Sequence, residues 1–137
     1  MMKQIKSKKR VQDHGEVFTA EREVKAMCDL IPEEIWENIE STFLEPSCGN
    51  GNFLVEIYAR KLERCSSDRD GIRALASITG IDIMPDNCEE SRTRLKRMFV
   101  DRFPDSDQND EVDAILEKNI ICGDSLEIMP QLKGAEQ

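Results

Sequence analysis

The sequence predicts an α/β fold in which a parallel sheet of three strands is joined by crossover helices. Short apolar segments rich in β-branched residues alternate with longer segments that have a helical repeat. Each apolar segment ends close to an acidic residue and a turn. Parallel neighbours need a crossover connection, and the intervening segments are long enough to provide one. A chain of 137 residues is expected to form a single domain.

The N-terminal residues 1–10, "MMKQIKSKKR", are expected to form a basic flexible arm ahead of a domain spanning residues 11–137. Residues 15–19, "GEVFT", are consistent with a compact turn or a short extended segment. Thr19 is a candidate N-cap for a helix that runs to about Leu30, because acidic residues follow it in the first turn. Pro32 predicts the start of a second, short helix.

The first strand is expected over residues 41–45, and after the glycines a helix should follow, with apolar residues at helical spacing from Phe53 to Leu62. Residues 65–71, "CSSDRDG", have the composition of a loop. The second strand is expected over 75–83. Its β-branched centre favours an extended conformation.

Pro85 predicts the start of a further helix, with acidic residues near its beginning and basic residues near its end. An acidic loop should follow, leading into a short helix over 112–116. The third strand is expected over 119–122 and ends at Gly123 and Asp124.

The three predicted strands end at Glu45, Asp82 and Asp124. Ligands of open parallel sheets bind beyond the carboxyl ends of the strands. One acidic residue after a strand is usually a turn or cap residue. Three at equivalent positions would repel one another unless a ligand accepts them, so together they indicate a binding site.

Gly49 and Gly51 follow the first strand, and glycine allows both a tight turn and close approach of a ligand to the backbone. The dinucleotide pattern G-x-G-x-x-G is absent, because residue 54 is leucine. Glu45 just before the turn would repel a phosphate and attract an ammonium group. S-adenosylmethionine fits this pattern, with its ammonium group near Glu45, its ribose hydroxyls near Asp82 and its exocyclic amine near Asp124.

The segment "LEPSCGNGNF", residues 44–53, resembles the (D/E)-P-x-C-G-x-G-x-F motif of S-adenosylmethionine-dependent DNA adenine methyltransferases from restriction–modification systems. "HGEVFT", residues 14–19, is similar to the G-x-x-F-T-P segment that precedes this motif in the family. "GIDI", residues 80–83, and "ICGDSL", residues 121–126, resemble the second and third motifs in the expected order. The resemblance covers roughly residues 11–126 and implies a partial Rossmann-like methyltransferase fold.

The resemblance also implies a role for each matching residue. Phe18 and Thr19 would hold the carboxylate end of the methionine moiety, largely through backbone groups, and Glu45 would bind the amino group. The turn over the methionine moiety would be shaped by Pro46, Cys48, Gly49 and Gly51.

At the adenosine end, Asp82 would accept the ribose hydroxyls and Ile83 would pack on one face of the adenine ring. Asp124 would meet the exocyclic nitrogen, and Ser125 and Leu126 would lie along the other side of the ring.

The sequence departs from the family in two respects. Residue 20 is alanine where the family usually has proline, and no (N/D/S)-P-P-(Y/F/W) catalytic motif is found. We therefore expect the N-terminal cofactor-binding half of such an enzyme, with no catalytic residue and no activity on its own. The alternative is a non-catalytic S-adenosylmethionine-binding module or partner subunit. A methyltransferase acting on protein or small molecules is less favoured, because "EPSCGNG" resembles the DNA family.

Charge, composition and the predicted sheet limit the partners and the location that can be expected for this chain. DNA is the substrate of the full-length family, but a net charge of −9 predicts weak or absent DNA binding by this chain. The open edge of a three-stranded sheet favours a homo-oligomer. No apolar run approaches the length of about 18 residues that a membrane span needs, and the N-terminus lacks a secretory signal. A cytoplasmic protein with reduced thiols is expected, and one histidine gives no support for a metal site.

Overall fold

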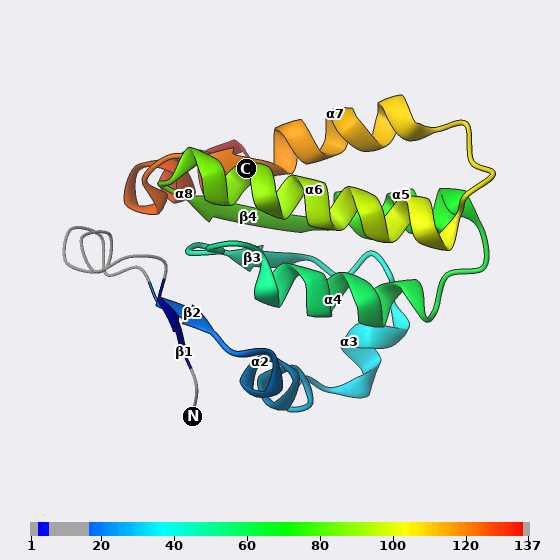
Figure 1. Ribbon diagram of the computed structural model, residues 1–137, viewed down its shortest axis with the longest axis horizontal. Coiled ribbons are helices and arrows are strands. Elements are labelled where there is room, and N and C mark those ends of the chain that lie inside the picture. The colour runs from blue at the N-terminus through cyan, green and yellow to red at the C-terminus, as the bar shows by residue number, and fades with distance from the viewer. Residues whose placement is uncertain (1–2, 6–16, 136–137) are drawn as a thin grey trace.

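The structure is a computed structural model that describes residues 3–5 and 17–135 (Figure 1). Its main sheet contains β3 (Phe43–Glu45), β4 (Ile78–Asp82) and β5 (Ile120–Cys122), in that order and all parallel. Glu45 pairs with Gly80, and Asp82 pairs with Cys122. The predicted α/β fold with a parallel three-stranded sheet is therefore confirmed.

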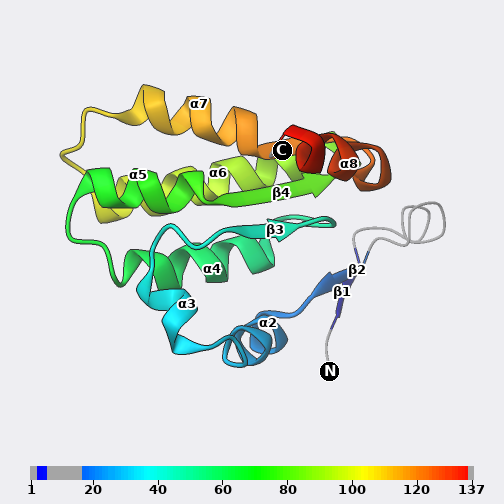
Figure 2. The ribbon, with the colours of Figure 1, turned by 180° about the vertical axis from the view of Figure 1, so that it is seen from behind.

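Each crossover contains two helices. α4 (Asn52–Leu62) and α5 (Asp68–Ala76) connect β3 to β4, and α6 (Pro85–Arg102) and α7 (Asn109–Asn119) connect β4 to β5. α4 and α6 pack against each other and lie in front of the sheet in Figure 1. The opposite view brings β3 and β4 to the front (Figure 2).

The core lies between these helices and the sheet. The apolar residues that repeat at helical spacing in α4 and α6 are buried against the inward side chains of β4 and β5. Its largest fully buried apolar side chains include Leu54, Tyr58, Leu75, Ile78, Leu95, Phe99 and Ile120.

The N-terminal segment forms a separate small sheet, in which β1 (Lys3–Ile5) pairs antiparallel with β2 (Val17–Thr19). Within the predicted basic arm the structure describes only β1, and His14 and Gly15 also lie outside its described residues. α2 (Glu21–Cys28) packs on α4, and the short α3 (Glu33–Glu37) places Trp36 in a stack on Phe43 with ring centroids 5.2 Å apart.

Two expectations about the second strand were wrong. Most of the predicted loop 65–71 lies in α5, and the strand begins at Ile78 rather than at residue 75. Ser67 caps the helix by accepting a hydrogen bond from the backbone N–H of Asp70, 3.1 Å away. Serine and aspartate gather at helix N-termini as well as in loops, so composition did not separate the two.

Other helix boundaries also differ. Thr19 is the last residue of β2, so the N-cap position of α2 falls on Ala20, and Pro32 occupies the N-cap of α3. α7 is longer than the predicted helix over 112–116. α8 (Ser125–Ala135) was not predicted, because Pro130 lies within it.

Among the described residues, no helix has both the length and the apolar character needed to cross a membrane.

Candidate functional site

Backbone hydrogen bonds connect the segments that follow β3 and β5 to the carboxyl end of β4. The N–H of Cys48, after β3, donates to the carbonyl of Ile81 over 2.8 Å. The N–H of Gly123, after β5, donates to the carbonyl of Asp82 over 2.9 Å. Glu45 and Asp82 end neighbouring strands and Asp124 follows the third, so all three lie at the carboxyl end of the sheet.

The turn between β3 and α4 requires glycine. Gly49 and Gly51 have φ values of 54° and 96°, in the left-handed region that disfavours other residues. A Cβ on Gly51 would lie 2.9 Å from Ser91 Oγ, so α6 leaves no room for a side chain there. Pro46 is exposed at the start of the turn, whereas Cys48 is buried within it.

Glu45 is half-buried at the end of β3, and its Oε1 accepts a hydrogen bond from the backbone N–H of Ser47 over 3.0 Å. This bond fixes one carboxylate oxygen against its own turn. A carboxylate can accept about four hydrogen bonds, so Glu45 retains acceptor capacity for a cationic donor.

Asp82 is only 8% exposed, and its carboxylate is held from α6. Its Oδ2 accepts from the Asn87 side-chain amide over 2.8 Å and from the Met84 N–H over 3.3 Å. The remaining acceptor capacity of the carboxylate suits a pair of hydroxyl donors. Asn87 was not predicted from the sequence; its position in the first turn of the helix that follows Asp82 was the available signal.

The thiols beside this carboxylate are kept neutral. Burial raises the pKa of Cys48 to about 12, and the negative charge of Asp82 acts in the same direction. Cys88 donates to the backbone carbonyl of Asp82 over 3.4 Å, and burial raises the pKa of its thiol as well. Such thiols are poor nucleophiles near neutral pH, so Cys48 fills space in the turn.

The turns after β4 and β5 expose apolar side chains beside the carboxylates. Ile83 is 47% exposed and Leu126 is 83% exposed. Asp124 is exposed, and its Oδ1 accepts from the Leu126 N–H over 2.9 Å, as an N-cap of α8 does. Asp124 therefore has a structural role, while Ser125 is half-buried in the first turn of α8.

Thr19 reaches the glycine turn through its backbone. Its carbonyl accepts from the Asn52 side-chain amide over 2.8 Å, and Asn52 Oδ1 in turn accepts from Arg94 Nη1 over 2.9 Å. The backbone of Phe18 lies in β2, opposite Gln4, and its side chain is outside the described part. Asn52 and Arg94 were not predicted from the sequence, in which they lie far apart.

Asn50 lies between the two glycines and presents an unused acceptor. Its Oδ1 is buried and has no hydrogen-bond partner among residues 3–5 and 17–135. A buried amide oxygen without a donor is costly, so the turn fits a ligand that brings one.

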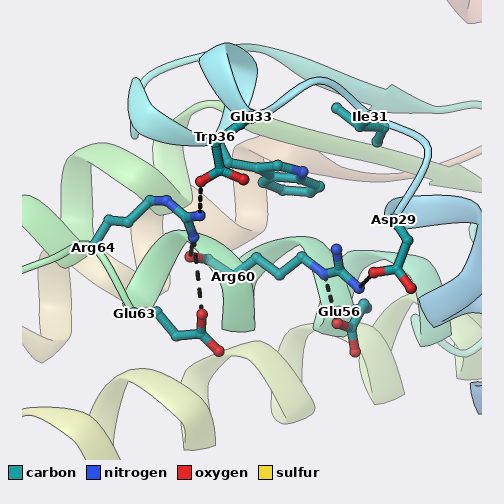
Figure 3. A pocket seen from close by; sticks show the side chains of 8 residues that line it. All are labelled: Asp29, Ile31, Glu33, Trp36, Glu56, Arg60, Glu63 and Arg64. Atoms are coloured by element: carbon teal, nitrogen blue, oxygen red, sulfur yellow. Dashed lines mark hydrogen bonds and ion pairs between the residues drawn. The ribbon is translucent and has the colours of Figure 1, made fainter.

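A polar cavity of about 290 Å³ lies away from this edge, between α3 and the C-terminal half of α4 (Figure 3). Arg60 pairs with Glu56 and Asp29, each over 2.8 Å, and Arg64 pairs with Glu33 over 2.5 Å. The cavity is lined by Asp29, Ile31, Glu33, Trp36, Glu56, Arg60, Glu63 and Arg64. Every acidic group of this lining has an arginine partner. These ion pairs hold the surrounding elements together, and the cavity offers a ligand no unpaired acidic group.

Within the described ranges, no group of three or more histidine, cysteine, aspartate or glutamate side chains is placed to hold a metal ion. Comparisons with protein-family models, curated proteins and solved structures found no match. The functional interpretation therefore depends on the chemistry of the residues at the carboxyl ends of the strands.

Proposed function

We propose that this chain binds S-adenosylmethionine at the carboxyl edge of its parallel sheet, as the cofactor-binding portion of a site-specific DNA adenine methyltransferase. The observation that supports this most is the buried carboxylate of Asp82, held beside a glycine turn at the end of the central strand. We interpret the parallel order β5–β4–β3 as half of a doubly wound sheet, whose ligands bind beyond the strand ends.

The donors and acceptors of the site fit this cofactor. The carboxylate of Asp82 accepts the two ribose hydroxyls, with its orientation fixed by Asn87 and Met84. The carboxylate of Glu45 accepts the ammonium group. Asp124 retains a carboxylate oxygen for the exocyclic amine, because the Leu126 bond uses the other one.

The apolar and backbone groups complete the fit. Ile83 and Leu126 provide exposed apolar surface for the adenine ring, whose transfer from water favours binding. The left-handed turn at Gly49 and Gly51 brings the backbone close to the methionine moiety. When bound, the cofactor supplies an electrophilic methyl group on its sulfonium; the residues of this chain bind and orient it.

Methyl transfer needs groups that we do not assign to this chain, since its sequence has no (N/D/S)-P-P-(Y/F/W) motif to hold a flipped adenine. The net charge of −9 also disfavours DNA contact by this chain. A non-catalytic binding module or partner subunit remains the second candidate function, and it shares the same site.

Isothermal titration with S-adenosylmethionine and S-adenosylhomocysteine tests the binding proposal, and transfer of a radiolabelled methyl group to unmethylated DNA tests the activity. We expect saturable binding of both ligands. Binding together with labelled DNA would show an enzyme that is active as this chain stands, whereas binding without incorporation is the result that both candidate functions predict for this chain alone. The absence of binding by either ligand would overturn the proposal.

A further inference from the structure

Arg94 on α6 connects the glycine turn, which follows β3 in the sequence, with the Thr19 segment, which precedes β3. Its Nη1 donates one hydrogen bond to the Asn50 carbonyl and one to Asn52 Oδ1, each over 2.9 Å. A terminal guanidinium nitrogen carries two hydrogens, so both are used. Both bonds are partly buried and charge-assisted, which makes them stronger than neutral hydrogen bonds exposed to water.

Asn52 extends this connection to the N-terminal segment. It is the first residue of α4, and its amide donates to the carbonyl of Thr19 over 2.8 Å. Thr19 ends β2, 33 positions earlier in the chain. One cation therefore fixes the glycine turn directly and the Thr19 segment through a single asparagine.

We propose that Arg94 and Asn52 are positioning residues that align the Thr19 segment with the glycine turn to form the amino-acid end of the binding site. This inference rests on the proposed function. The two residues act on the methionine moiety and not on the nucleoside, because Asp82 and Ile83 belong to β4 and the turn that follows it. The unpartnered Oδ1 of Asn50 lies in the same turn, where its placement depends on the Arg94 bond.

Two ligands separate this role from general support of the fold. S-adenosylhomocysteine contains the amino-acid moiety, whereas 5′-methylthioadenosine has the same thioether nucleoside without it. Arg94→Met keeps much of the apolar stem and removes both donors. We expect its affinity for S-adenosylhomocysteine to fall about tenfold and its affinity for 5′-methylthioadenosine to change by less than about twofold.

Asn52→Ala removes the connection to Thr19 from the other side and should give the same pattern. It also serves as the test if Arg94→Met does not fold, because it truncates one side chain at the start of a helix. Arg97→Met, an exposed position on the same helix, is the matched control and should change neither affinity. Thermal unfolding of each variant shows that the folded protein is being titrated.

An equal loss for both ligands would overturn the inference, because it would show general damage to the site. Unchanged affinity for both ligands would overturn it as well. Failure of the proposed function is distinguishable, because the unsubstituted protein would then bind neither ligand.

Discussion

At the scale of single residues, Asp82 has an environment unlike that of a surface carboxylate. It is buried at the end of the central strand, with Asn87 and Met84 donating to the same oxygen. A carboxylate fixed in this way is preorganised, because its side chain is already ordered before a ligand binds and loses little conformational entropy on binding.

Asp82→Asn tests this arrangement with little change in volume. The amide retains an acceptor for Asn87 but loses the charge that would strengthen bonds to hydroxyl donors. We predict that affinity for S-adenosylmethionine falls by more than about 1 kcal/mol, and that 5′-methylthioadenosine is affected equally because the lost contact is to ribose. Calorimetric titration of both ligands measures the change.

Glu89→Gln is the control for Asp82→Asn, because it removes one negative charge from an exposed position on α6. Equal binding by the unsubstituted protein and Asp82→Asn would contradict the assignment of the ribose site to Asp82.

Lys61 is a second unusual residue, because its side chain is fully buried. Its ammonium group donates to the carbonyls of Ile39 and Ser41, over 2.8 and 2.7 Å, just before β3. Burial lowers the pKa of Lys61 to about 8 from its ordinary value of 10.5, although Cys65 and Glu40 act in the opposite direction. The folded protein therefore releases this proton at a lower pH than the unfolded chain does.

The sign of the resulting pH dependence follows from proton binding. Between about pH 8 and pH 10.5 the unfolded state binds more protons at Lys61, so its contribution to the free energy of unfolding rises with pH. We predict that the unsubstituted protein gains stability relative to Lys61→Met across this range, by an amount of order 3 kcal/mol.

Urea unfolding of the unsubstituted protein and of Lys61→Met at several pH values measures this difference directly. The difference in the free energy of unfolding between the two proteins is more informative than either pH profile alone. The buried thiols titrate in both proteins, and above their ordinary pKa they lower the stability as the pH rises. Parallel pH profiles would show that Lys61 titrates alike in the folded and unfolded states.

At the scale of elements, the unit formed by β3, the glycine turn and α4 couples stability to the site. Gly51 occupies the N-cap of α4 with φ 96°, and Ser91 on α6 packs against it. We predict that Gly51→Ala destabilises the protein by about 1–3 kcal/mol, because alanine is strained at this φ and its Cβ meets Ser91 Oγ. Thermal or urea unfolding provides the measurement.

The double variant Gly51→Ala/Ser91→Ala separates the two causes. Removing Oγ should recover only part of the loss relative to Ser91→Ala alone, because the backbone strain remains. The Cα and Cβ of Ser91 also stay close, since each would lie 3.3 Å from the added methyl group. An unchanged unfolding midpoint for Gly51→Ala would contradict the argument.

The elements that could be predicted from the sequence are those with a clear apolar repeat, a β-branched centre or a proline that marks the start of a helix. The apolar residues of α4, the Pro85 start of α6 and the β-branched centre of β4 are local signals. α5 was missed because Ser67 and its neighbouring aspartates have the composition of a loop, although Ser67 caps a helix.

For the site, the order of the strands was enough to place Glu45, Asp82 and Asp124 at one edge. The polar contacts among helices were not predictable in the same way. Arg94 and Asn52 are 42 positions apart, and their hydrogen bond depends on how α6 packs on α4. Nothing in the local sequence distinguishes Arg94 from the exposed Arg97.

At the scale of the whole molecule, the sheet has an edge formed by β3, which pairs only with β4 among the described strands. Leu44, in the middle of this strand, is 45% exposed. An edge strand with an exposed apolar side chain can pair with another strand, whereas lysine on an edge prevents such pairing. We therefore predict self-association through β3, and we expect Leu44→Lys to weaken it.

The net charge of −9 gives this prediction a further property that can be measured. Two copies with the same net charge repel each other, and added salt screens that repulsion without weakening apolar contact or backbone pairing. Sedimentation velocity at tens of micromolar protein should therefore show more dimer as ionic strength rises. Leu30→Lys, at another exposed leucine, makes the same change away from the edge and should leave the dimer intact. A monomer at every salt concentration would contradict the prediction, and equal dimerisation of Leu44→Lys would place the interface elsewhere.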